Sequence, residues 1–289
     1  MEFIKKLFLP ITLPIRFIQN NFKAMLFLLL VVVLFAPTQE SEFRKNNLQE
    51  IKLTGPIMDV TSILEQIQKA QNNKNIKGVL LNVNSPGGSV APSIEIAYAI
   101  KRLNNIKPVV VYASGTIASG SYYASIWADK IFANPGSMVG SIGVVMEGAN
   151  LSGLMKKLGV ESQVIQAGKY KTVGTPTRKW KNYEVAELNK VIQSTYDMFT
   201  QDVANARKLD IKKRDSFANA HIFTASQAKE VGLIDEIGVS YDAKLYLAQK
   251  AGVKKPVWNK EDKLEKLLKN LSASTLVTLY TYFPEITIK

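Results

Sequence analysis

Two residues of this chain could together hydrolyse an acyl bond: a serine in a small-residue turn and a lysine in a glycine-flanked segment. Ser119 lies in Ser114-Gly-Thr-Ile-Ala-Ser-Gly-Ser-Tyr-Tyr123, and Lys171 lies in Gln166-Ala-Gly-Lys-Tyr-Lys-Thr-Val-Gly174. A serine nucleophile needs a neighbouring base, donors for the developing oxyanion and a site that excludes water. A lysine can be that base when burial lowers its pKa toward the working pH. The two segments therefore predict a serine–lysine hydrolase.

Other residues that could act as the base are less favoured. The chain has a single histidine, His221, and nothing in its surroundings marks it as catalytic. We expect a structural or surface role for it. Lys169 lies only two residues from Lys171 and is a rival for the base.

A second serine–lysine pattern occurs at Ser226-Gln-Ala-Lys229, which matches the Ser-x-x-Lys arrangement of penicillin-binding enzymes. The companion motifs of those enzymes are missing from the chain. Thr224 and Gln227 have the spacing of a capping box, so this segment is predicted to begin a helix.

The candidate serine is preceded by two strand-and-helix units. Residues 78–83 form a short apolar run typical of a buried strand, followed by the turn Asn84-Ser-Pro-Gly-Gly-Ser89 and a predicted helix over 91–103. Such a turn can aim backbone amides at an oxyanion or a phosphate, although an ordinary strand-to-helix turn is equally consistent with it. Residues 108–113 predict the second strand, and 119–128 the second helix.

A longer helix is predicted over residues 183–208. Val185, Leu188, Ile192 and Phe199 recur there at helical spacing, which favours a helix packed in the core or against another subunit.

Three motifs in a fixed order give the chain a family resemblance. They are Ser85-Pro-Gly-Gly88, Ser119-Gly-Ser-Tyr-Tyr123, and Gly140-Ser-Ile-Gly-Val144 after Asn134-Pro-Gly136. In these motifs the chain resembles the signal peptide peptidase A family, also called protease IV, in its short bacterial form. The resemblance covers roughly residues 51–238. Downstream, Asn219-Ala-His221 and Phe223-Thr-Ala225 replace the Asp-Gly-Arg and aromatic-Thr-Gly turns that are typical of the family.

The resemblance implies an α/β fold of repeated β-β-α units, like crotonase and the proteolytic subunit of Clp. It implies Ser119 as nucleophile, Lys171 as general base and Ser141 as the residue that positions the lysine. The amides of Gly88 and Gly120 would form the oxyanion hole. It further implies a homo-oligomer whose active sites are completed between subunits.

The N-terminal part contains a membrane-anchor candidate. Ala24–Ala36 is a 13-residue apolar run that follows basic residues, whereas a spanning helix usually needs roughly 20 apolar residues. A signal peptide, a short anchor and a buried amphipathic helix are all compatible with it. Pro37 would hinder cleavage after Ala36, so we expect an uncleaved, single-pass anchor in the bacterial inner membrane, with its basic end cytoplasmic and the catalytic domain outside.

The expected organisation has three parts: a cytoplasmic tail, anchor and stalk over residues 1–45, a peptidase domain over 46–252, and a basic C-terminal helix and tail over 253–289. The last part carries a dense set of lysines, which predicts a solvated helical face or contact with anionic lipid; they are Lys254, Lys255, Lys260, Lys263, Lys266 and Lys269.

Composition limits the chemistry and the partners. The chain of 289 residues has no cysteine, which excludes disulfides and a thiol nucleophile. It also lacks a Cys/His cluster of the kind that would predict a zinc site. We expect no cofactor. The net charge is +13, but the basic residues are spread out and no nucleic-acid-binding module is recognisable.

The predicted function is that of a membrane-anchored serine endopeptidase that hydrolyses hydrophobic peptides, including remnant signal peptides if the resemblance extends to substrates. Two alternatives remain. One is a crotonase-like acyl-thioester enzyme, whose acid/base carboxylates are not apparent near these motifs. The other is a catalytically silent, oligomeric membrane scaffold.

Overall fold

The computed structural model describes residues 19–28 and 46–259, which belong to two separate units of the chain. Residues 19–28 are helical and include the first five residues of the apolar run. Within the two described ranges, no helix is both long and apolar enough to cross a membrane. The rest of the apolar run and residues 260–289 of the basic C-terminal part lie outside the described residues. Residues 253–259 are not helical.

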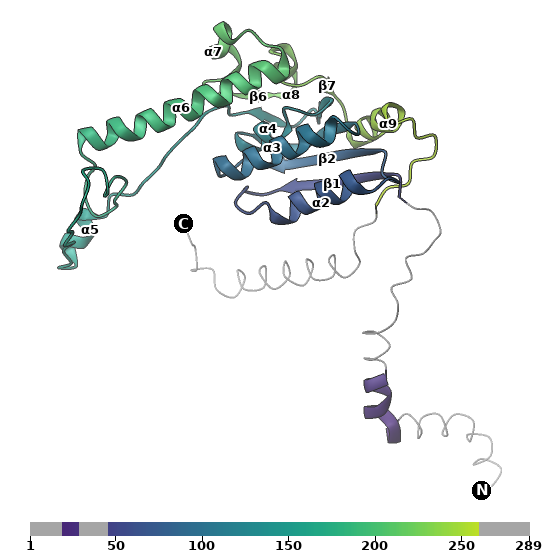
Figure 1. Ribbon diagram of the computed structural model, residues 1–289, viewed down its shortest axis with the longest axis horizontal. Coiled ribbons are helices and arrows are strands. Elements are labelled where there is room, and N and C mark those ends of the chain that lie inside the picture. The colour runs from purple at the N-terminus through teal and green to yellow at the C-terminus, as the bar shows by residue number, and fades with distance from the viewer. Residues whose placement is uncertain (1–18, 29–45, 260–289) are drawn as a thin grey trace. The chain divides into compact units, whose positions relative to one another are not determined.

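A sheet forms the centre of the second unit (Figure 1). Its parallel strands follow the order β1 (Leu48–Thr54), β2 (Gly78–Ser85), β3 (Val109–Ala118), β4 (Lys130–Ala133) and β7 (Glu236–Ile237). The apolar runs predicted as strands are the central β2 and β3, whose side chains are almost all buried near their N-terminal ends. This burial matches the rule that strands inside parallel sheets are apolar on both faces.

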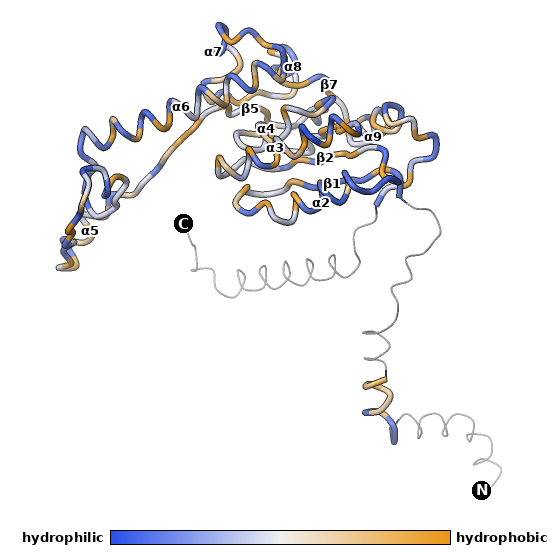
Figure 2. Tube along the Cα trace, viewed as in Figure 1, coloured by the Kyte–Doolittle hydropathy of each residue, from blue (hydrophilic) through white to orange (hydrophobic). Residues whose placement is uncertain are grey.

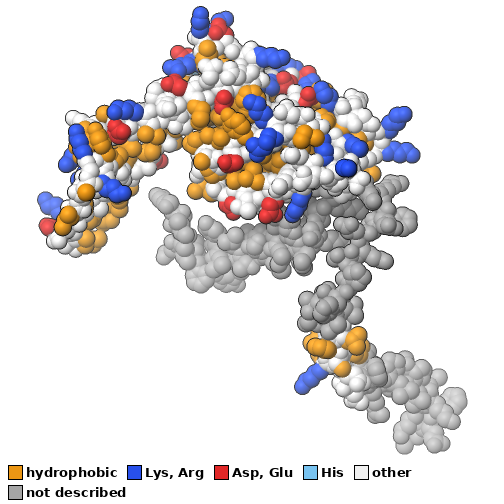
Figure 3. Space-filling model, in the orientation of Figure 1, with side chains coloured by type: hydrophobic (Ala, Val, Ile, Leu, Met, Phe, Trp, Pro, Cys, Tyr) orange, Lys and Arg blue, Asp and Glu red, His pale blue; other side chains and the backbone are white. Residues whose placement is uncertain are grey.

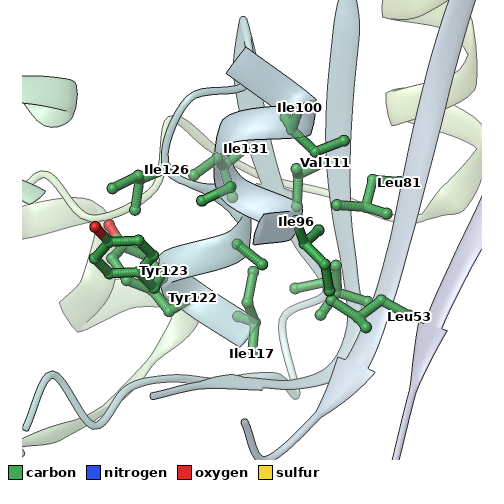
Figure 4. Packing of buried hydrophobic residues seen from close by; sticks show 14 of the residues in the cluster. Leu53, Leu81, Ile96, Ile100, Val111, Ile117, Tyr122, Tyr123, Ile126 and Ile131 are labelled. Carbon is green, nitrogen blue, oxygen red and sulfur yellow. The ribbon is translucent and has the colours of Figure 1, made fainter. Parts of the chain in front are cut away.

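Helices cover both faces of the sheet. They are α2 (Thr61–Asn72), α3 (Val90–Asn104) and α4 (Gly120–Ser125), which share one apolar cluster with the sheet, and α9 (Ser240–Lys250), which shares a second. Consecutive residues of β2 divide between them, because Val79 and Leu81 belong to the first cluster and Leu80 to the second. Figure 4 shows the first cluster, where Ile96 and Ile100 of α3 lie close to Leu81 and Val111.

The predicted helix over residues 119–128 is shorter in the structure. Ser119 has a φ of 53°, which is outside the helical region, so α4 begins at Gly120 and ends at Ser125. The helix expected over 91–103 is present as α3, and the one expected over 183–208 is present as α6 (Asn182–Arg207).

The chain after β4 returns to the end of β3. Strand β5 (Met138–Gly140) pairs in parallel with the last residues of β3, and β6 (Ile222–Thr224) pairs with β5 in the opposite direction. The short helices η1 (Ile211–Lys213) and α7 (Arg214–Phe217) precede β6, and α8 (Ala225–Glu230) follows it. The predicted capping box is confirmed, since Thr224 and Gln227 cap α8 reciprocally, and Lys229 forms a 2.8 Å ion pair with Glu236.

Residues 146–181, which we call the arm, lie at the N-terminal end of α6 and contain α5 (Ser152–Lys157) (Figure 1). Helix α6 buries Phe199, Thr200, Val203 and Ala204 near its C-terminal end, and otherwise buries only Glu184. Helix α5 buries no side chain. The arm is therefore attached to the core by α6 and by the apolar stretch that follows β5 (Figure 2).

Candidate active site

Ser119 occupies a strained turn between β3 and α4. Its φ and ψ are 53° and −125°, a conformation that a residue other than glycine rarely adopts. Two backbone hydrogen bonds hold it there: its N–H donates to Gly140 O at 2.8 Å, and its carbonyl accepts from Tyr123 N–H at 3.0 Å. The side chain forms no helix-capping hydrogen bond. A sharp strand-to-helix turn of this kind exposes a nucleophilic hydroxyl.

Ser121, two residues further on, has a different role. It is completely buried, and its Oγ accepts from Ala118 N–H at 2.8 Å and donates to Ser85 O at 2.7 Å. These bonds tie the start of α4 to the ends of β2 and β3. Its hydroxyl is thus occupied in the structure, in contrast to that of Ser119.

The backbone amides of Gly88 and Gly120 lie beside this turn. A Cβ added to Gly120 would be 3.3 Å from Gly88 N, and one added to Gly87 would be 2.6 Å from Gly120 N and 2.9 Å from Ser119 Cβ. Neither the Gly88 nor the Gly120 N–H donates a hydrogen bond to another described residue. Two adjacent, unpaired N–H groups next to a serine can stabilise an oxyanion.

A cavity of about 200 Å³ opens where α3, α4, α6 and the chain after β5 meet. Ser119, Ser141, Gly88 and Gly120 all lie on its lining. Much of the remaining lining is apolar, with Val90 and Ile94 from α3, Tyr123 from α4, Met198 and Phe199 from α6, and Val144 and Val145 after β5. The cavity therefore suits an apolar side chain next to the serine.

Tyr123 lines the cavity, a position that the sequence patterns did not predict. Its ring meets Phe199 edge-on with centroids 4.9 Å apart, and its hydroxyl donates to the Asp202 carboxylate. Burial and the neighbouring Asp202 raise the pKa of Tyr123 far above its usual range, so the hydroxyl stays protonated. Tyr123, beside Tyr122 in Figure 4, thus fastens the helix that follows Ser119 to α6.

Ser141 reaches the cavity because β5 pairs with the end of β3, where Gly140 lies opposite Ala118. It too has a positive φ, 50°, and its N–H donates to His221 O at 2.7 Å. The side chain of His221 is exposed. His221 thus contributes a backbone carbonyl to the support of Ser141.

Lys171 is not among the residues that line the cavity. It lies on the arm with an exposed side chain, in a turn where its N–H donates to Gly168 O at 3.2 Å. The rival Lys169 has its ammonium 4.7 Å from the centroid of the Tyr183 ring. The structure therefore brings together Ser119, Ser141 and the two glycines, and it leaves both lysines on the arm.

No metal centre accompanies this arrangement in the part of the chain that the structure describes, because no three His, Cys, Asp or Glu side chains gather there. The site consists of a hydroxyl, backbone amides and an apolar cavity.

Comparisons with known proteins identify the family of the chain. The sequence profile of peptidase family S49 matches residues 101–254, and that of Clp protease matches residues 42–138, in agreement with the α/β fold. A protein of Enterococcus faecium named as a signal peptide peptidase SppA is 40% identical over 63% of this chain and 53% of its own length. Protease 4 of Salmonella typhi is 34% identical over 65% of this chain and 31% of its own length.

A protein of Methanocaldococcus jannaschii named as a protease is 44% identical over 68% of this chain and 62% of its own length. This chain thus spans 62% and 53% of the first two of these relatives in order of similarity. A solved membrane-bound stomatin-specific protease matches at 16% identity with a TM-score of 0.46, covering 71% of this chain and 86% of its own, which is too distant to bear on function. The profile match covers more than half of the chain, and the chain belongs to peptidase family S49, the family of signal peptide peptidase A and protease 4.

Proposed function

We propose that the protein is a membrane-anchored serine endopeptidase that uses a Ser119–Lys171 dyad to hydrolyse hydrophobic peptides, remnant signal peptides among them. The observation that carries this proposal is the left-handed backbone of Ser119 on the lining of a cavity, beside two unpaired amides. Such strain persists only where the surrounding structure enforces it, and it is concentrated at functional sites.

In the proposed mechanism, the neutral Lys171 amine takes the proton of Ser119 as the serine oxygen bonds to the peptide carbonyl carbon. The negative charge that develops on the carbonyl oxygen is stabilised by the Gly88 and Gly120 amides. The C–N bond then breaks, and the lysine gives its proton to the departing amine. Water attacks the acyl-enzyme, loses a proton to the lysine, and the serine recovers its proton as the C–O bond breaks.

We propose that the lysine comes from a neighbouring copy of the chain. The exposed position of Lys171 on the arm, away from the cavity lining of its own chain, supports this arrangement. Ser141 lies on the cavity lining together with Ser119. Its hydroxyl would accept a hydrogen bond from the incoming amine, or donate one to it, and so position it. The arm also exposes many apolar side chains that a second copy could cover (Figure 3); they include Leu151, Leu154, Leu158, Val160, Val164 and Ile165.

The proposed membrane location and substrate class rest on two apolar features. The run Ala24–Ala36 would anchor the chain, with the peptidase domain on the extracytoplasmic side. The apolar lining contributed by α3, α4 and α6 favours peptides with apolar side chains next to the cleaved bond.

A fluorophosphonate probe, followed by mass spectrometry of the purified full-length protein, tests this function. We expect a single covalent adduct on Ser119, no adduct in Ser119→Ala, and slower labelling in Lys171→Ala. An adduct on a different residue, or no adduct on properly assembled protein, would reject the proposed nucleophile.

Replacement of Gly88 by alanine tests the oxyanion hole. The added Cβ would lie 2.2 Å from Ile57 O, and because that atom belongs to the backbone, the turn must move and carry the amide with it. We expect kcat to fall by about 10²- to 10³-fold, the cost of one lost oxyanion donor. Gly136→Ala is the matched control, since its Cβ would meet nothing closer than Asn134 Oδ1 at 3.5 Å. An unchanged kcat in Gly88→Ala would remove this amide from the mechanism.

A further inference from the structure

The arm contains an ion pair with unusual burial. Glu184, in the first turn of α6, has a side chain with 0% exposure and is the only charged residue that is buried in the described part of the chain. Arg178 donates two hydrogen bonds to its carboxylate, from Nη1 to Oε2 at 2.8 Å and from Nη2 to Oε1 at 2.7 Å. The N–H of Lys181 donates to the same carboxylate at 2.7 Å. This is the bidentate geometry that makes Arg–carboxylate pairs directional.

The same guanidinium reaches the turn that carries the proposed base. Arg178 Nη2 donates to Thr172 Oγ1 at 3.2 Å, and Thr172 is the residue next to Lys171. The Thr172 hydroxyl in turn donates to Gln166 Oε1 at 2.9 Å. A continuous chain of hydrogen bonds therefore runs from the start of α6, through Arg178, to both sides of the turn that contains Lys171.

Apart from an edge-on contact between the Tyr170 and Tyr183 rings, with centroids 5.6 Å apart, little apolar packing holds this turn. Helix α5 buries no side chain, and residues 161–171 are exposed throughout. A surface segment of this kind is mobile unless specific bonds order it. The network around Arg178 supplies such bonds, together with the one from Trp180 Nε1 to Thr175 O at 3.0 Å.

We propose that Arg178 and Glu184 are positioning residues: through the Thr172 hydroxyl they hold the Lys171 turn in the geometry that lets the lysine reach the serine of a neighbouring copy. This inference rests on the proposed function, because it assigns Lys171 the role of base. Neither residue touches the substrate. By ordering the turn in advance, they reduce the conformational entropy that is lost when the Lys171 amine docks beside Ser119.

The charge state of the pair fits this role. The Arg178 guanidinium, followed by the Lys181 N–H, lowers the pKa of Glu184 from 4.5 to about 2. A carboxylate with a depressed pKa stabilises the folded form fully above its ordinary pKa, and this stabilisation is lost as the pH falls through the depressed value. The arm should therefore keep this order at every pH above about 4.5 and lose it only between that pH and about 2.

The test measures the rate at which the fluorophosphonate labels Ser119 in the full-length protein as a function of pH. Thr172→Val removes the hydroxyl with little change of volume, and Thr172→Ser restores the hydroxyl. We expect Thr172→Val and Arg178→Lys to slow labelling by on the order of 10- to 100-fold at each pH, because a misplaced amine loses effective concentration toward the serine. Thr172→Ser should label at nearly the wild-type rate.

Glu187→Gln is the matched control, since it breaks the exposed pair with Lys190 on the same helix and should leave the profile unchanged. Lys171→Ala separates the two claims. If Lys171→Ala labels slowly while Thr172→Val and Arg178→Lys keep the wild-type profile, the positioning role is wrong and the dyad stands. If Lys171→Ala itself has the wild-type profile, the dyad is wrong and the positioning role falls with it.

Discussion

Replacement of Ser119 by alanine is expected to lower the hydrolysis of a hydrophobic fluorogenic peptide by roughly 10⁶-fold, the scale seen when a nucleophile is removed from a serine protease. Ser119 lies on the cavity lining, and its hydroxyl caps no helix, so its removal should stop acylation without loosening α4. Steady-state kinetics of the full-length protein give the rate. Size-exclusion chromatography establishes that the variant still assembles.

Ser226→Ala is the control for this variant. Ser226 belongs to the other serine–lysine pattern and is exposed at the start of α8, where Lys229 is already paired with Glu236. We expect it to keep the wild-type rate. Full activity in Ser119→Ala, or loss of activity in Ser226→Ala, would contradict the assignment of the nucleophile.

Replacement of Lys171 by alanine is expected to reduce hydrolysis by about 10²- to 10⁴-fold, the contribution of a general base. Without the amine, no described side chain on the cavity lining can act as the base, since Ser141 offers only another hydroxyl and His221 is not part of the lining. The measurement is kcat/KM for the same peptide, with labelling of Ser119 as a second readout.

Two variants control the choice of base. Lys169→Ala removes the rival lysine, whose ammonium lies over the Tyr183 ring, and His221→Ala removes the single imidazole. Both variants should retain activity within a few-fold of wild type, because substitutions of exposed side chains usually have small effects. A larger loss in Lys169→Ala than in Lys171→Ala would reassign the base to Lys169.

Local sequence patterns predicted the elements around the site well. The apolar runs of β2 and β3 could be recognised because strands buried on both faces are continuously apolar, and α3 and α6 because apolar residues recur at helical spacing. The start of α8 followed from its capping box. The end of α4 was placed too late, because the chain tightens there: the N–H of Ile126 donates to Tyr123 O, three residues back, and α4 ends at Ser125.

The gathering of Gly88, Ser119 and Ser141 has a simple topological cause. Each follows a strand, and β2, β3 and β5 run parallel, so their carboxyl ends share one edge of the sheet. The motifs therefore predicted residues that the structure does place on one cavity. Their chemical roles remain predictions.

Other features depend on contacts that are distant in sequence. Tyr123 lines the cavity. Its ring contacts Phe199 and its hydroxyl contacts Asp202, and both of these residues belong to α6, which is distant in sequence. The sequence marks Glu184 only as an acidic residue in the first turn of a predicted helix. Its ion pair with Arg178 could not be predicted from the spacing of residues along the chain. Lys171 lies on the arm and not on the cavity lining, so the described part of one chain does not assemble the proposed dyad.

Co-expression of Ser119→Ala with Lys171→Ala is the most direct test of a dyad shared between copies. Each variant keeps the half of the site that the other lacks, so with random assembly about a quarter of the sites should hold both an intact serine and an intact lysine. We expect the mixed protein to recover about that share of wild-type peptide hydrolysis, whereas Ser119→Ala co-expressed with the Ser119→Ala, Lys171→Ala double variant should recover none. Mixed assemblies that are no more active than either variant alone would contradict a site built from two copies of the chain.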